Sequence, residues 1–229
     1  FRSLGRLSYD GATAGIRLNV SSTRWTYLNN EQSIFRNRLS NYAGLTVLGN
    51  VTSKTALVAN VAANQEVYDE SKTLNSTTYS ASTGLQWNVT EKTSGEILAG
   101  YQHLKFANAE SGQTVAGLQF PRSSDSYGNF FFVSNVSWKP TPFLTLYLQG
   151  YRSFQQSVML NALFFTSTGA NFSAIHTLTD STALTLNMGI ENDSFENPAP
   201  TPDNPNRVDL IKNVVVGVSY RTVKWAGAS

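Results

Sequence analysis

Apolar and polar residues alternate with a period of two through most of this chain. The clearest case is residues 182–193, where one parity is apolar (Leu184, Leu186, Met188 and Ile190) and the other is polar (Thr185, Asn187, Gly189 and Glu191). Because successive side chains of a β-strand point to opposite faces, this pattern predicts strands with one apolar and one polar face. The same alternation recurs in residues 16–21, 57–64 and 144–151. In residues 93–106 it is irregular, and the sequence does not assign the two faces there.

Turn-forming residues divide these strands into hairpins, joined alternately by short and long connections. The short turns fall at residues 9–12, 50–54, 88–92, 139–142 and 178–181, and the long polar connections at residues 28–36, 69–76, 107–127, 156–162 and 196–207. Residues 50–55 (NVTSKT) and 88–93 (NVTEKT) are near copies, which indicates a hairpin repeat. We expect ten complete strands between about residues 13 and 221, most of them about 14 residues long, with residues 2–9 left over as an odd strand.

Strands of this length favour a membrane barrel over a soluble sandwich. At about 3.3 Å per residue, 14 residues span over 40 Å, whereas about 9 to 11 residues cross a bilayer and strands of soluble proteins usually have about 5 to 6. Charged residues make up only 14% of the chain, and the polar parity is mainly Ser, Thr, Asn, Gln, Gly and Tyr, which suits a wet lumen. The apolar parity would meet lipid, where only a closed sheet leaves no unpaired edge.

The predicted fold is therefore all-β: a transmembrane antiparallel up-and-down β-barrel with short periplasmic turns and long extracellular loops, in a bacterial outer membrane. Aromatic residues near the strand ends predict two girdles at the membrane interfaces. One would include Trp87, Trp138, Phe143 and Trp225 beside short turns, and the other Trp25, Tyr27, Tyr68, Phe106, Phe154 and Phe195 beside long connections.

The residues that usually perform chemistry are scarce. The chain has no cysteine and only two histidines, His103 and His176, neither of which stands in a recognised nucleophilic motif. The net charge is +2 and the charges are spread along the chain, so the sequence gives no footprint for nucleic acid. We expect no enzyme activity and no catalytic, cofactor or metal site. Arg17 and Arg152 are expected to face inward or to snorkel, and the proline-rich residues 198–205 to form an exposed loop that could contact a partner.

Three segments, residues 92–101 (KTSGEILAGY), 137–146 (SWKPTPFLTL) and 179–186 (TDSTALTL), resemble hairpins of the outer-membrane β-barrel family called putative beta-barrel porin 2. The resemblance extends over residues 56–220. Members of that family are generally longer than this chain, and many occur beside exopolysaccharide-export systems. The resemblance implies a pore or export role and transfers no functional residue.

The predicted function is an outer-membrane channel or export conduit for hydrophilic solutes or polysaccharide. One alternative is a structural barrel that anchors an envelope partner, and another is a secreted β-rich adhesin or fibre. The expected partners are the lipid bilayer, solutes or polysaccharide in the lumen, and envelope proteins or further copies of the chain. Because residues 2–9 leave an odd strand and residues 225–229 lack a terminal aromatic residue, we expect residues 1–229 to be one barrel domain that is part of a longer barrel.

Overall fold

The computed structural model describes residues 1–28, 36–90, 92–107, 114–115, 118–119, 126–156, 164–195 and 207–221. Eleven strands form one sheet: β1 (Arg2–Asp10), β2 (Ala14–Trp25), β3 (Arg38–Thr52), β4 (Thr55–Tyr68), β5 (Ser76–Thr90), β6 (Thr93–Phe106), β9 (Ser126–Thr141), β10 (Leu144–Gln156), β11 (Phe164–Thr179), β12 (Thr182–Phe195) and β13 (Val208–Tyr220). A 3-10 turn, η1 (Lys72–Leu74), and a separate pair, β7 (Thr114–Val115) and β8 (Leu118–Gln119), complete the elements.

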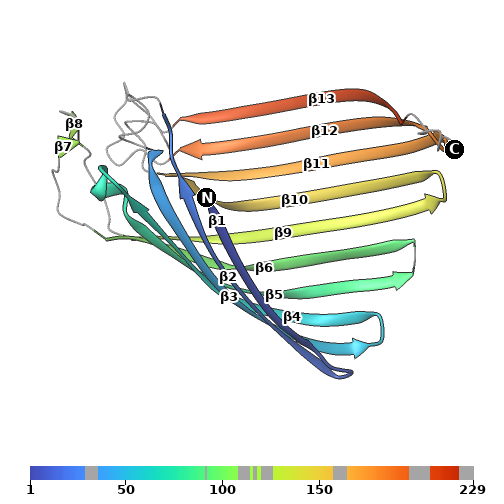
Figure 1. Cartoon of the computed structure of the whole chain (residues 1–229), viewed down its shortest axis with the longest axis horizontal. Helices are drawn as coiled ribbons and strands as arrows, with labels where there is room; N and C mark the ends of the chain where they lie inside the picture. The colour runs from blue at the N-terminus through green and yellow to red at the C-terminus, as the bar shows by residue number, and fades with distance from the viewer. Residues whose placement is uncertain are drawn as a thin grey trace, which may run out of the picture.

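The sheet is an antiparallel meander in which each strand pairs with the strands of the sheet that precede and follow it in the chain (Figure 1). This confirms the predicted all-β, up-and-down topology, with ten strands after the first hairpin turn and one strand before it. No helix among the described residues has the length and apolar character needed to cross a membrane.

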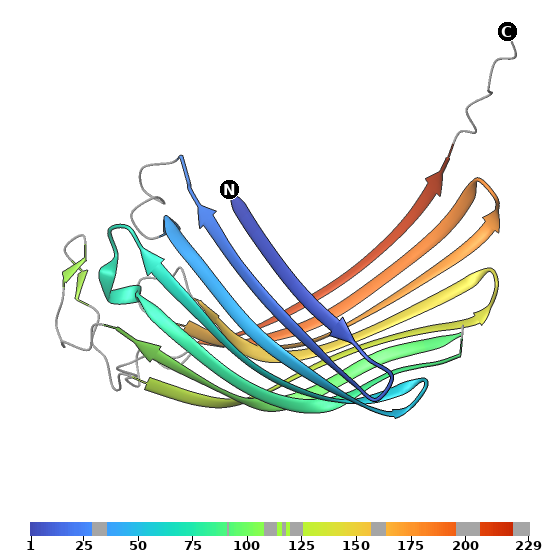
Figure 2. The same cartoon turned by 60° about the horizontal axis from the view of Figure 1, so that its bottom comes forward.

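The sheet curls into an open trough and does not close into a barrel (Figures 1 and 2). Its two rims are β1 and β13, which pair with β2 and β12 respectively and, within the described residues, not with each other. The sequence predicted a barrel of which this chain is a part, and the described residues form an open sheet and not a closed barrel. The sequence pattern specifies the neighbour pairs, whereas closure depends on a contact between strands at opposite rims.

Threonine closes the short turns of three hairpins. The pairs Thr52 with Thr55, Thr90 with Thr93 and Thr179 with Thr182 end the ladders, each after a shift in register. In each hairpin the first threonine's hydroxyl accepts a backbone N–H of the turn: the Thr52 hydroxyl from Lys54 at 3.1 Å, that of Thr90 from Lys92 at 3.1 Å, and that of Thr179 from Ser181 at 3.3 Å. Such hydroxyls stabilise turns because they satisfy donors that the ladder leaves unpaired.

A repeated backbone hydrogen bond joins each hairpin to the next. At four junctions the residue at the bulge donates its N–H to a carbonyl in the preceding turn: Asn50 to Thr13 (2.8 Å), Asn88 to Lys54 (2.7 Å), Lys139 to Lys92 (2.6 Å) and Thr177 to Phe143 (2.8 Å). Arg221, which follows β13, makes the corresponding bond to Ser181 (2.8 Å). The near-identical segments NVTSKT and NVTEKT supply two of these junctions. The sequence repeat is therefore also a structural repeat.

The two faces of the sheet differ in composition. On the outer face, large apolar side chains are exposed, including Leu184 (38%), Met188 (41%) and Ile190 (48%), and the described residues form no second layer over them. The predicted orientation of this apolar parity, away from any protein core, is confirmed. Two exposed aromatic residues of β9 lie on the same outer face: Trp138 at the turn end and Phe130 nearer the loop end. At about 3.3 Å per residue, they are about 26 Å apart along the strand.

The inner face is crowded where the sheet curls, and there it is partly apolar. Leu48, Ala56 and Val58 form a buried cluster with Leu98 packed against it. Leu98 pairs with Gly84, and a Cβ on Gly84 would lie 1.8 Å from the Ile97 carbonyl oxygen, so only glycine fits there. The structure thus assigns the faces of β6, with Leu98 inside and Ile97 outside.

A second inner cluster fills the space where β9 and β10 separate. Their pairing ends at Arg152 and Phe132, beyond which β9 pairs only with β6. Buried Leu104, Phe106 and Phe164 occupy this space, with Leu74, Tyr127 and Phe154 packed around them. The predicted girdle beside the long connections is therefore wrong for Tyr68, Phe106, Phe154 and Phe195. Tyr68, Phe106 and Phe195 are only 3%, 4% and 7% exposed, because their strand parity directs them inward.

Candidate functional site

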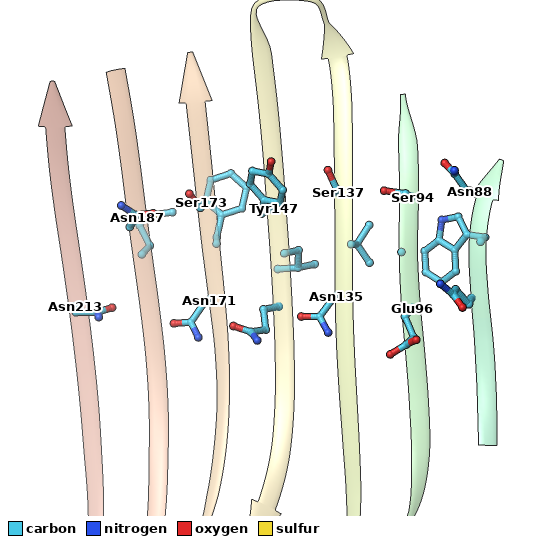
Figure 3. Close-up of a pocket in the computed structure, with 18 residues that line it drawn as sticks. Asn88, Ser94, Glu96, Asn135, Ser137, Tyr147, Asn171, Ser173, Asn187 and Asn213 are labelled. Carbon is cyan, nitrogen blue, oxygen red and sulfur yellow. The ribbon is translucent and has the colours of Figure 1, made fainter. Parts of the chain in front are cut away.

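A row of five amide side chains and one carboxylate crosses the inner face at right angles to the strands, and it is called the amide row here. Six residues form this amide row, directly paired from strand to strand or separated by a glycine: Gln86 on β5, Glu96 on β6, Asn135 on β9, Gln149 on β10, Asn171 on β11 and, across Gly189 of β12, Asn213 on β13. Figure 3 shows Glu96, Asn135, Asn171 and Asn213 in one line. The row results from alternation in strands whose register is fixed, because each strand contributes one inward residue at this level.

A second polar row lies one step nearer the short turns. It consists of Asn88, Ser94, Ser137, Tyr147, Ser173 and Asn187, which pair in the same register. Together the two rows line a groove of about 840 Å³ on the sheet (Figure 3). The inward side chains of the two rows are hydroxyls, amides and one carboxylate, and Trp87, Val136, Leu148, Phe172 and Met188 also line the groove. The polar groups can exchange hydrogen bonds with water or with hydroxylated solutes.

The amide groups are accessible and are not used to hold the sheet together. Asn135, Gln149 and Asn213 are exposed, and no member of the amide row makes a side-chain hydrogen bond to another described residue. Two of them converge at Gly189, where a Cβ would lie 2.3 Å from the Asn213 Oδ1 and 2.6 Å from the Asn171 Oδ1. The missing side chain leaves room for both amides, whose donors and acceptors remain available to a solute.

The loop end of the inner face is held by an ion pair enclosed by aromatic rings. The Arg38 Nε lies 3.0 Å from the Glu66 Oε2, and the Arg38 guanidinium also lies over the rings of Trp25 and Tyr68. Asn64 donates to the other Glu66 oxygen at 3.0 Å. These contacts join β2, β3 and β4 at their loop ends and pair two inward charges with each other.

The two arginines singled out in the sequence are both bonded within the sheet. Arg17 lies on the inner face and pairs with Asp10 at 3.2 Å. Arg152, at the point where β9 and β10 separate, donates to Thr168 at 2.9 Å and to Asn129 at 3.4 Å. Arg152 therefore bridges the gap between β9 and β11, which alternation alone does not predict.

Neither histidine lies in a constellation that suggests catalysis. His103 pairs with Tyr79 near the loop end, and His176 pairs with Leu144 and Leu184 near the short turns, both exposed on the apolar parity. Within the described ranges no group of three or more His, Cys, Asp or Glu residues could hold a metal ion. Residues 198–205 and Trp225 lie outside the described residues.

Comparison with known families matches residues 13–225 to the family described as putative beta-barrel porin 2. The chain belongs to this family. Membership in the putative beta-barrel porin 2 family agrees with the meander, the apolar outer face and the polar groove, and it confirms the resemblance found in the hairpin segments. No curated protein and no solved structure matches the chain. Sequence reasoning identified the polar parity but not the amide row, because the row depends on the register between strands far apart in the sequence.

Proposed function

We propose that this protein is an outer-membrane channel through which hydrophilic solutes pass by diffusion. The most direct support is that a single-layer sheet has an accessible groove with polar side chains on one face and an exposed apolar surface on the other. A wet interior and a lipid-facing exterior are the two surfaces of a transmembrane barrel. The porin family to which the chain belongs supports the same function.

The groove suggests how solutes would move. A solute that enters a narrow passage loses part of its hydration, and neutral donors and acceptors on the wall replace those hydrogen bonds without holding the solute tightly. Five amides and one carboxylate across six strands offer such exchange along the whole width of the groove. The same chemistry suits sugars and polysaccharides, whose hydroxyls both donate and accept.

We further propose that the wall is completed by additional strands of a longer barrel. In lipid, each unpaired backbone N–H or C=O costs several kcal/mol, so a spanning sheet has no free edge. The rims β1 and β13 each leave one edge unpaired within the described residues. A larger strand number would also widen the lumen, because barrel diameter grows with the number of strands.

Conductance measurements test the channel. The purified protein, inserted into planar bilayers, is expected to give discrete conductance steps, and proteoliposomes that contain it are expected to swell in iso-osmotic solutions of neutral monosaccharides. A protein that inserts, as judged by protease protection and heat-modifiable electrophoretic mobility, but neither conducts nor admits sugars would contradict the proposal. That result would favour the scaffolding barrel.

A further inference from the structure

We propose that the channel wall selects cations over anions and that Glu96 is the main determinant of this selectivity. The inference rests on the proposed channel function and adds to it the class of solute that the wall favours. It is based on the distribution of charge among the inward-facing rows around the groove, and not on any single acidic cluster.

Glu96 is the one charged residue among the described residues that line the groove. Three inward rows are adjacent here: the amide row, the second polar row and the row that contains Leu98. The charged residues that the described strands place in these rows are Asp10, Glu96 and Glu191. Among the described strand residues no lysine, arginine or histidine belongs to these rows; Arg17, the partner of Asp10, lies in the next inward row. The lysines nearest along the chain, Lys54, Lys92 and Lys139, belong to the short-turn end of the sheet.

Glu96 differs from the other two carboxylates because no described residue bonds to its side chain. Asp10 is paired with Arg17 at 3.2 Å, and Glu191 accepts a hydrogen bond from the Ser167 hydroxyl at 2.5 Å. Glu96 makes no ion pair and no side-chain hydrogen bond with any described residue. It lines the groove between Gln86 and Asn135, its paired neighbours in the amide row, so its charge faces the path of a solute (Figure 3).

An unpaired carboxylate on a protein wall attracts cations and repels anions in the water beside it. For a passing ion about 7 Å away in water, Coulomb's law gives an effect on local concentration of about threefold. Salt weakens this effect, because the screening length falls from about 10 Å at 0.1 M to about 3 Å at 1 M. Selectivity that originates at Glu96 must therefore decrease as ionic strength rises.

Reversal potentials in a potassium chloride gradient across a planar bilayer test this inference. The unmodified protein is expected to favour potassium, more strongly near 0.1 M than near 1 M salt. Glu96→Gln keeps the size and polarity of the side chain, and we expect it to lower the ratio of potassium to chloride permeability about two- to threefold. Glu96→Lys should shift the reversal potential further in the same direction.

Glu70→Gln is the matched control, because it removes the same charge from an exposed position between β4 and η1. It should leave the reversal potential unchanged. If the channel conducts without preferring cations, or if Glu96→Gln and Glu70→Gln behave alike, the inference is wrong while the channel function stands. If inserted protein does not conduct at all, both fail. Heat-modifiable mobility of each variant establishes that it is folded.

Discussion

At the scale of single residues, the tightest constraint in the sheet is the close approach of β5 and β6. Gly84 and Gly100 lie on the inward parity of these strands, and a Cβ on either would fall within 2.1 Å of a backbone carbonyl oxygen of the neighbouring strand. Backbone atoms cannot move aside as the end of a flexible side chain can. These glycines therefore fix how closely the two strands pack at the curl of the sheet.

Gly84→Ala should destabilise the folded sheet by about 1–3 kcal/mol or more, because the added methyl group overlaps the Ile97 carbonyl. The measurement is the urea midpoint of protein refolded in detergent micelles. Gly49→Ala is the control, since a Cβ there would meet nothing within 4 Å. Equal midpoints for the two variants would show that the close approach of β5 and β6 is not a constraint.

The alternation of residues predicted which side of most strands is apolar, and the structure bears this out for Leu184, Met188 and Ile190. It did not predict that Leu48, Val58 and Leu98 face inward, because these residues depart from the polar composition of their parity. They pack together only because curvature brings β3, β4 and β6 close on the concave side. Such packing depends on three-dimensional shape and leaves no signal at the level of one strand.

At the scale of elements, the hairpin with its threonine turn is the repeating unit of the molecule. The hydroxyl of Thr90 accepts the N–H groups of Lys92 and Thr93, both at 3.1 Å, and the neighbouring bulge residue Asn88 donates to the preceding turn at 2.7 Å. The near-identical turn segments allowed this repeat to be predicted from the sequence. The bonds between successive hairpins were not predictable, because they join residues more than 30 positions apart.

Thr90→Val should lower the free energy of unfolding by about 0.5–1.5 kcal/mol, since the turn loses its hydroxyl acceptor while side-chain shape is kept. Thr141→Val is the control. Thr141 occupies the corresponding position of the β9–β10 hairpin, paired with Leu144, but its hydroxyl makes no hydrogen bond to another described residue. Chemical denaturation in micelles measures both variants, and a larger loss at Thr141 would argue against the role of the hydroxyl.

At the scale of the whole molecule, the main prediction concerns which face of the sheet meets lipid. Leu85 and Gln86 are consecutive residues of β5 on opposite faces: Leu85 is 45% exposed on the outer face, and Gln86 lines the groove. Leu85→Arg should reduce the stability of the membrane-inserted protein by about 2–4 kcal/mol if it lies near the middle of the bilayer, whereas Gln86→Arg should have little effect.

Refolding into lipid vesicles, followed by denaturant titration, measures this difference. An equal loss for the two variants would mean that both faces have the same surroundings, and the assignment of a lipid face and a wet face would be wrong. Alternation was sufficient to predict the meander and its two surfaces. The expectation of a longer barrel came from the odd strand at residues 2–9 and not from alternation, because a contact that closes the wall involves residues at opposite ends of the strand order.

The direction of the two rims restricts how such a wall can be sealed. Both β1 and β13 run from the loop end toward the short turns, as the first and the eleventh strand of a meander must. Direct contact between them would thus form a parallel seam, whereas a seam with only antiparallel neighbours requires an odd number of intervening strands. Since the chain contains no cysteine, one cysteine introduced on each rim would distinguish these two geometries by whether a disulfide forms.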